Sequence, residues 1–132
     1  MAGAKGDLRS DLGRARGLGS AKEGVHHWWA QRVSAIALIP LSLWFVASIV
    51  CLTDADRALA IRWLGSPVTL GLMSLFLVAL IYHAALGLQV IVEDYIHGKA
   101  AKLVLLLLIQ FAGIGLVAAG IIALLLIAMY GG

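Results

Sequence analysis

Three long apolar segments alternate with short polar connections along this chain. They run over residues 33–52, 68–92 and 103–130, and most of the charged residues lie outside them. An α-helix rises about 1.5 Å per residue, so each segment is long enough to cross the roughly 30 Å hydrocarbon layer of a bilayer. The pattern predicts an all-α membrane protein with three transmembrane helices.

The composition supports this fold class and narrows the function. Of the 132 residues, 62% are hydrophobic and 13% are charged, and the mean hydropathy of +0.99 lies well above that of soluble domains. Three spans leave too little chain outside the membrane for a soluble catalytic domain. The single cysteine, Cys51, excludes an internal disulfide and matches no metal-ligand spacing. A stand-alone enzyme is therefore not expected.

Positive charge is sorted between the two sides of the predicted membrane. On one side, before the first span and between the second and third, are Lys5, Arg9, Arg14, Arg16, Lys22, Arg32, Lys99 and Lys102; on the other are Arg57 and Arg62. The positive-inside rule then predicts a cytoplasmic (or mitochondrial matrix) N-terminus and a C-terminus on the outer side. The pI near 9.4 reflects this sorting, and no nucleic-acid partner is expected.

The chain divides into two parts. Residues 1–24 are rich in Gly, Ala, Ser and charge, too poor in large apolar groups to build a core, and are predicted to be extended or disordered. Residues 25–132 form the three-helix transmembrane part. At its start, Trp28 and Trp29 suit the headgroup region, where amphipathic rings settle.

Several residues predict local features of the spans. Pro40 predicts a bend in the first span because it cannot donate a backbone hydrogen bond. The connection from Thr53 to Ser66 is expected to be a loop, in which Ser66 caps the second span and Pro67 occupies its first turn. Small residues at spacings of three and four predict a helix-packing face on the third span: Ala112, Gly115, Ala119 and Ala123.

One histidine, His83, lies deep inside the second span. An ionisable residue in hydrocarbon requires a partner and marks a functional site. Ala79 and Gly87, four residues away on either side, place small groups one turn above and below it. A flat group such as haem fits that face, since a neutral imidazole nitrogen binds iron. Two alternatives stay open: a hydrogen bond to a neighbouring helix that packs closely, and a proton relay, which usually needs further polar residues.

A polar pair ends the second span. Asp94 follows His83 by eleven residues, which places it about 20° from the same helix face and about 16 Å along the axis. Tyr95 offers a phenolic hydroxyl at the depth where a membrane-dissolved quinone headgroup arrives. Quinone reduction requires hydrogen-bond donors on the carbonyl oxygens and a proton supply. The pair is a candidate quinone site, although both residue types are common at helix ends.

Two segments resemble a known family. They contain Gly24-Val25-His26 and Arg32-Val33-Ser34-Ala35-Ile36 at the entry to the first span, and His83-Ala84, Gly87, Gln89-Val90 and Asp94-Tyr95 on the second. With the three-helix topology, they resemble the small hydrophobic membrane-anchor subunit (the D-type cytochrome b anchor) of succinate dehydrogenase, respiratory complex II. The resemblance implies a subunit that does not itself oxidise succinate.

The resemblance implies roles for five residues. His83 would be one of two axial ligands to the iron of haem b, the other coming from the larger cytochrome b anchor subunit. Tyr95 would help to bind ubiquinone, with Asp94 as its acidic neighbour. His26 and Arg32 would lie near the haem propionates, where a cation and an imidazole offset the anionic charge.

The resemblance also implies cofactors and partners outside this chain. FAD would be carried by a flavoprotein subunit, the clusters by an iron–sulfur subunit, and haem b would be shared with the larger anchor in membrane lipid. The expected function is that of a membrane anchor of succinate:ubiquinone oxidoreductase, in the respiratory chain and the tricarboxylic acid cycle. The bacterial inner membrane is favoured over the mitochondrial one. The alternatives are a three-helix proton-relay or transport subunit using His83, and a purely structural assembly partner.

Overall fold

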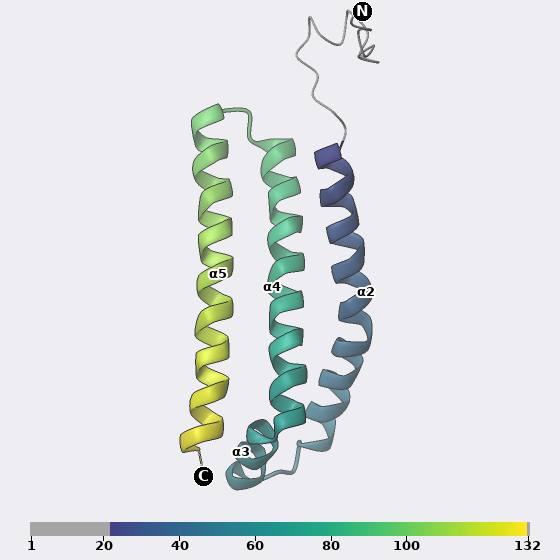
Figure 1. The fold of residues 1–132 in the computed structure, drawn as a ribbon, viewed down its shortest axis with the longest axis vertical. Coiled ribbons are helices and arrows are strands. Elements are labelled where there is room, and N and C mark those ends of the chain that lie inside the picture. Colours follow the sequence, from purple (N-terminus) through teal and green to yellow (C-terminus); the bar gives the residue numbers. More distant parts are fainter. Residues whose placement is uncertain (1–21, 132) are drawn as a thin grey trace, which may run out of the picture.

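A computed structural model describes residues 22–131 and contains four helices in that range (Figure 1). They are α2 (Lys22–Cys51), α3 (Arg57–Gly65), α4 (Pro67–Tyr95) and α5 (Lys99–Tyr130), and no strand occurs among these residues. Three of them, α2, α4 and α5, are long and apolar enough to cross a membrane. The prediction of an all-α fold with three spans is confirmed.

The three long helices lie side by side in one layer, with α4 in the middle (Figure 1). Helix α4 packs against both neighbours, whereas α2 and α5 do not contact each other over the described residues. A layer one helix thick has almost no interior, and Leu86 is the one buried hydrophobic side chain between residues 22 and 131. Both faces of the layer therefore require lipid or other protein to cover them.

The connections divide between the two ends of the layer. The start of α2 and the α4–α5 connection lie at one end, whereas α3 and the end of α5 lie at the other (Figure 1). This arrangement separates Lys99 and Lys102 from Arg57 and Arg62 along the direction in which the helices run. The side of the membrane that each end faces stays a prediction from the charge pattern.

Helix α2 extends beyond the predicted span at its polar end. It begins about three turns before residue 33, so residues 22–24, which were expected to belong to the polar segment, are helical. Residues 1–21, the rest of that segment, lie outside the described residues. Hydropathy misses such an extension because a helix continues wherever its backbone hydrogen bonds are made, whether or not its side chains are apolar.

The residues that were predicted to bend or cap the spans take these positions in the helices. Helix α2 runs on through Pro40 and is bowed in Figure 1. Ser66 caps α4: its hydroxyl oxygen accepts a hydrogen bond from the backbone N–H of Thr69 over 3.3 Å, and Pro67 occupies the first helical position. The prediction for the start of the second span is confirmed.

The connection before α4 contains a helix, α3, where the sequence indicates a loop. Asp56 caps it by accepting a hydrogen bond from the backbone N–H of Leu59 over 2.7 Å. Helix α3 packs against α5 and α4, and Trp63 stacks on Trp44 of α2 with ring centroids 6.0 Å apart. These tertiary contacts stabilise a nine-residue helix that would be marginal in isolation.

The contact between α4 and α5 uses glycines other than the predicted packing face. All four predicted residues, Ala112, Gly115, Ala119 and Ala123, are exposed, and a side chain added at Gly115 would meet no atom within 4 Å. Gly113 instead faces Ile81, and Gly120 faces Leu77. A shift of one residue turns a helix face by about 100°, so the predicted face lies beside the contact with α4, and its packing against another helix stays a prediction.

The close contact at Gly120 predicts a large effect of added volume. Gly120→Leu should push α4 and α5 apart, because even a Cβ atom there collides with the side chain of Leu77. Overpacking of this kind costs about 1–3 kcal/mol, which a lower melting temperature of the detergent-solubilised protein will report. At Gly71 an added Cβ meets no atom within 4 Å, so Gly71→Leu is the matched control. Equal melting temperatures for the two variants would contradict the contact.

Candidate functional site

His83 faces α2 and has a partner there. Its Nδ1 atom lies 2.9 Å from the Oγ atom of Ser34. That hydroxyl is in turn 3.0 Å from the backbone carbonyl oxygen of Gln31, three residues earlier on α2. Ser34 is 7% exposed, which makes it one of the few buried polar side chains between residues 22 and 131. The intramembrane histidine therefore has the hydrogen-bonding partner that its cost in hydrocarbon requires.

The two contacts of Ser34 favour the imidazole tautomer of His83 that carries its proton on Nδ1. A hydroxyl has a single hydrogen, and the Gln31 carbonyl can only accept, so the hydroxyl donates to that carbonyl. Its oxygen then accepts from His83, so Nδ1 is the protonated nitrogen. A neutral imidazole protonated at Nδ1 carries its free lone pair on Nε2.

The Nε2 atom of His83 is open for a ligand. Over the described residues it makes no hydrogen bond. The buried side-chain polar atoms without a partner in the same range are His27 Nε2 and Gln31 Oε1, so His83 Nε2 is not sealed inside the chain. No group of three or more His, Cys, Asp or Glu side chains that could hold a metal ion occurs there either. Within the described part, His83 offers a single ligand atom.

A single protein ligand suits haem and does not suit a zinc or calcium site. Zinc requires at least three protein ligands and calcium a cage of oxygens. Haem iron takes its equatorial ligands from the macrocycle and needs protein atoms only at its axial positions. The donor set at His83 therefore fits haem, provided that another chain supplies any second axial ligand.

The two small residues beside His83 have different surroundings. Ala79 lines a groove of about 640 Å³ between α2 and α4, which Ser34 also lines. At Gly87, by contrast, an added Cβ would lie 3.9 Å from Nε2 of Gln31. The space for a flat group is thus open on the Ala79 side and is approached by Gln31 on the Gly87 side.

The structure separates the two residues expected near the haem propionates. His26 lines the same α2–α4 groove as Ser34 and Ala79. Arg32 is turned away from it: the guanidinium carbon lies 5.0 Å from the ring centroid of Trp28. Six residues of helix place the two side chains about 120° apart. His26 therefore shares a groove with Ser34, the partner of His83, whereas Arg32 lies on another face of α2.

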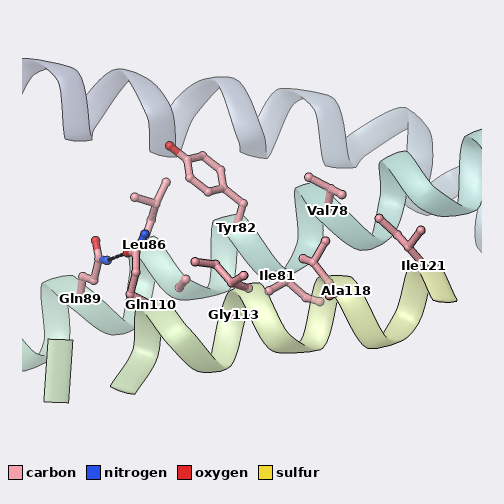
Figure 2. A pocket seen from close by; sticks show the side chains of 12 residues that line it. Val78, Ile81, Tyr82, Leu86, Gln89, Gln110, Gly113, Ala118 and Ile121 are labelled. Atoms are coloured by element: carbon pink, nitrogen blue, oxygen red, sulfur yellow. Dashed lines mark hydrogen bonds between the residues drawn. The ribbon is translucent and has the colours of Figure 1, made fainter. Parts of the chain in front are cut away.

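A second groove, of about 630 Å³, lies between α4 and α5 (Figure 2). Its lining is mostly apolar, with one amide pair in which Gln89 Nε2 donates to Gln110 Oε1 over 3.4 Å. Tyr82 borders this groove and the α2–α4 groove. Gln89 thus faces α5, whereas Tyr82 also reaches the groove that Ser34 and Ala79 line.

Asp94 and Tyr95 occupy the last two positions of α4, at the end of the layer where α2 begins. Both side chains are exposed, Tyr95 to 76%. Neither has a hydrogen bond or an ion pair with another of the described residues. Both are thus free to meet a ligand or another subunit, and this chain by itself encloses no pocket around them.

Polar side chains between α2 and α4 gather in the half of the layer nearest to Asp94. His27, Gln31 and Ser34 follow one another along one side of α2, at the spacing of a single helix face. Deeper in the layer the same interface becomes apolar, with Phe45 stacked on Phe76 at 4.9 Å between centroids. The polar strip therefore stops near the middle of the layer and does not cross it.

The contact between Ser34 and His83 is absent from the sequence-based expectations, where Ser34 enters only as a member of a family motif. Counting residues from the joined ends of the two helices would have predicted this contact. Ser34 lies 17 residues before Cys51, and His83 lies 16 residues after Pro67. In antiparallel helices joined at those ends, the two residues reach the same depth.

Known proteins similar to this chain share one description. Residues 7–117 match the succinate dehydrogenase/fumarate reductase transmembrane subunit family. The succinate dehydrogenase hydrophobic membrane anchor subunit of Rickettsia bellii (strain RML369-C) is 34% identical over 117 residues, which cover 89% of this chain and 94% of the relative. The protein of the same description from Paracoccus denitrificans is 31% identical over 110 residues, covering 83% and 84%. The succinate dehydrogenase membrane anchor subunit of Reclinomonas americana is 31% identical over 96 residues, covering 70% and 80%.

Proposed function

This chain belongs to the succinate dehydrogenase/fumarate reductase transmembrane subunit family as a multi-pass membrane-anchor subunit. We propose that it holds haem b through His83 and contributes Tyr95 and Asp94 to a ubiquinone site. The haem would be shared with a larger cytochrome b anchor subunit. The electrons would come from succinate, oxidised on the FAD of a flavoprotein subunit, through an iron–sulfur subunit. The location proposed is the inner membrane of a bacterium.

The observation that carries the haem assignment is the state of the His83 imidazole. Its Nδ1 atom is bonded to Ser34 and its Nε2 atom is left without a partner over the described residues. A histidine kept in the membrane only for packing would be expected to satisfy both nitrogens, because an unpaired polar atom in hydrocarbon costs several kcal/mol (roughly 2–7). An open Nε2 is what a metal ligand requires.

Haem b, when bound, supplies a one-electron redox centre inside the membrane. The residues of this chain provide its surroundings. His83 would hold the haem iron through Nε2, and His26 lines the adjoining groove, where its ring would donate a hydrogen bond to a propionate. Arg32 can take the same role only by leaving the Trp28 ring, which costs about 0.5–1 kcal/mol for an exposed cation–π contact.

At the proposed quinone site, residues of this chain donate a hydrogen bond and transfer protons. Reduction of ubiquinone to ubiquinol consumes two electrons and two protons. The Tyr95 phenol can donate to a quinone carbonyl oxygen and so stabilise negative charge that develops there. The exposed Asp94 carboxyl beside it can pass protons from the aqueous phase to the bound headgroup.

The rival assignment, a proton-relay or transport subunit using His83, has less support. A relay across the membrane requires polar groups along a continuous path. The strip of His27, Gln31 and Ser34 gives such a path only to the middle of the layer. Beyond it, the stacked rings of Phe45 and Phe76 form an apolar contact between the two helices. A purely structural subunit, the third alternative, would tolerate His83→Leu with no change in the spectrum of the complex.

Purification of the complex through a tag on this chain tests the assignment. We expect a flavoprotein, an iron–sulfur protein and a larger hydrophobic subunit to co-purify in fixed ratio. The reduced-minus-oxidised optical spectrum should show a low-spin b-type haem. A complex with these partners but no haem would remove the haem assignment and keep the anchor role. A colourless chain without partners would contradict both.

A further inference from the structure

We propose that Ser34 is the positioning residue for the haem ligand: its hydroxyl holds the His83 imidazole in the tautomer and orientation that present Nε2 to the iron. It thereby influences how tightly the haem is held and at what potential it is reduced. This inference rests on the proposed role of His83 as an axial ligand, and adds to it a residue on a different helix.

The geometry around Ser34 restricts its hydroxyl to one arrangement. The Oγ atom lies 3.0 Å from the Gln31 carbonyl oxygen and 2.9 Å from His83 Nδ1. Both contacts contain a hydrogen only if Nδ1–H of His83 donates to Oγ of Ser34 and the Ser34 hydroxyl donates to the Gln31 carbonyl oxygen. The carbonyl belongs to the α2 backbone three residues away, so it cannot rotate to accept elsewhere. The arrangement that makes both contacts hydrogen bonds therefore places the proton of His83 on Nδ1.

Ser34 fills this role alone among the described residues. It supplies the one hydrogen bond of His83 among the described residues. The neighbours of His83 along the same helix face, Ala79 and Gly87, have no polar side-chain atoms. Tyr82, its sequence neighbour, lies along the two grooves. Without the Ser34 oxygen, the Nδ1–H group loses the one acceptor that it has among the described residues.

Loss of the hydroxyl would act on the iron in two ways. An imidazole without an acceptor for Nδ1–H gains by rotating or by moving its proton to Nε2, and both changes compete with coordination of the metal. The acceptor also raises the basicity of the coordinating nitrogen. A more basic ligand favours the oxidised, more positively charged iron, so its loss should raise the midpoint potential of the haem.

The test compares Ser34→Thr with Ser34→Val in the purified complex. Both variants add the same branched bulk, so any packing damage is shared, and they differ only in the hydroxyl. In a helix, a threonine Oγ1 atom can still bond the carbonyl three or four residues back. Three quantities are measured: the haem b content per complex, the midpoint potential of the haem, and the g values of its low-spin ferric electron paramagnetic resonance signal.

We expect Ser34→Thr to match the wild type and Ser34→Val to differ in all three readouts. Removal of such a supporting hydrogen bond typically weakens metal binding by about 10–100-fold, so haem should be lost on dilution or dialysis. The haem that remains should show a higher midpoint potential and shifted g values. Ser42→Ala, on the same helix but not bonded to His83, should leave all three unchanged.

Two results would overturn the inference. Equal behaviour of the valine and threonine variants, whether both intact or both impaired, would show that the hydroxyl has no role beyond volume. A wild-type complex without haem, or one whose haem survives His83→Ala unaltered, would instead remove the proposed ligand and this inference with it. The first result leaves the haem assignment standing, so the two failures are distinguishable.

Discussion

The complex carrying His83→Ala is expected to lose its low-spin haem b spectrum. A low-spin b-type centre with two imidazole ligands needs a strong-field nitrogen on each side of the iron, and alanine has none to offer. The haem either dissociates or stays on its remaining ligand with a changed spin state, and the optical and electron paramagnetic resonance spectra change in both cases. The effect should approach complete loss of the wild-type signal.

The matched control is His97→Ala. His97 is an exposed histidine in the connection between α4 and α5, so its removal deletes an imidazole without touching the α2–α4 interface. Its complex should keep the wild-type spectrum. Both variants are purified with their partner subunits, and haem is quantified per flavin. A His83→Ala complex with an unaltered spectrum would exclude His83 as a ligand and reopen the question of what partner its Nε2 atom has.

The proposed role of His83 could be inferred from sequence because a histidine in the membrane requires a partner. An imidazole in hydrocarbon needs a partner, and neighbouring small residues at the helical spacing suggest a flat one. The structure supplies what spacing along one helix cannot: the depth at which a second helix passes. That depth brings Ser34 to His83 and lets Gln31 approach the space beside Gly87.

Hydropathy predicts the spans well because the bilayer imposes one length and one polarity on every crossing helix. The same rule is silent on α3, a short helix whose stability comes from a stacked tryptophan pair and contacts with α5. Hydropathy also does not show which face of a helix packs against its neighbour. Small residues recur on two adjacent faces of α5, and only the packed structure shows that Gly113 and Gly120, rather than Gly115, meet α4.

The proposed quinone site is the part of the proposed function that this chain describes least. Asp94 and Tyr95 are exposed, and neither is bonded to another described residue. Under the proposed function, the walls that enclose a headgroup come from other subunits. What this chain does contribute is position: both residues stand at the end of α4, at the same end of the layer as the polar strip that leads to His83 (Figure 1).

For Tyr95→Phe, we expect succinate–quinone reductase activity to fall on the order of tenfold or more while succinate–dye activity stays intact. The substitution removes one phenolic hydroxyl and leaves the ring. A hydrogen bond to an oxygen that gains negative charge contributes about 1.5–3 kcal/mol, and each 1.36 kcal/mol is about a factor of ten in rate. Because Tyr95 is 76% exposed and unbonded within the described chain, folding should be unaffected.

Tyr130→Phe is the control for Tyr95→Phe, since Tyr130 is 74% exposed, ends α5 and lies at the opposite end of the layer. It should leave both activities unchanged. The dye accepts electrons before they reach the membrane subunits, so the two assays separate catalysis at the quinone from assembly of the complex. Parallel loss of both activities in Tyr95→Phe would assign Tyr95 to the contact with the iron–sulfur subunit. Full quinone activity would show that the quinone's hydrogen-bond donors lie elsewhere in the complex.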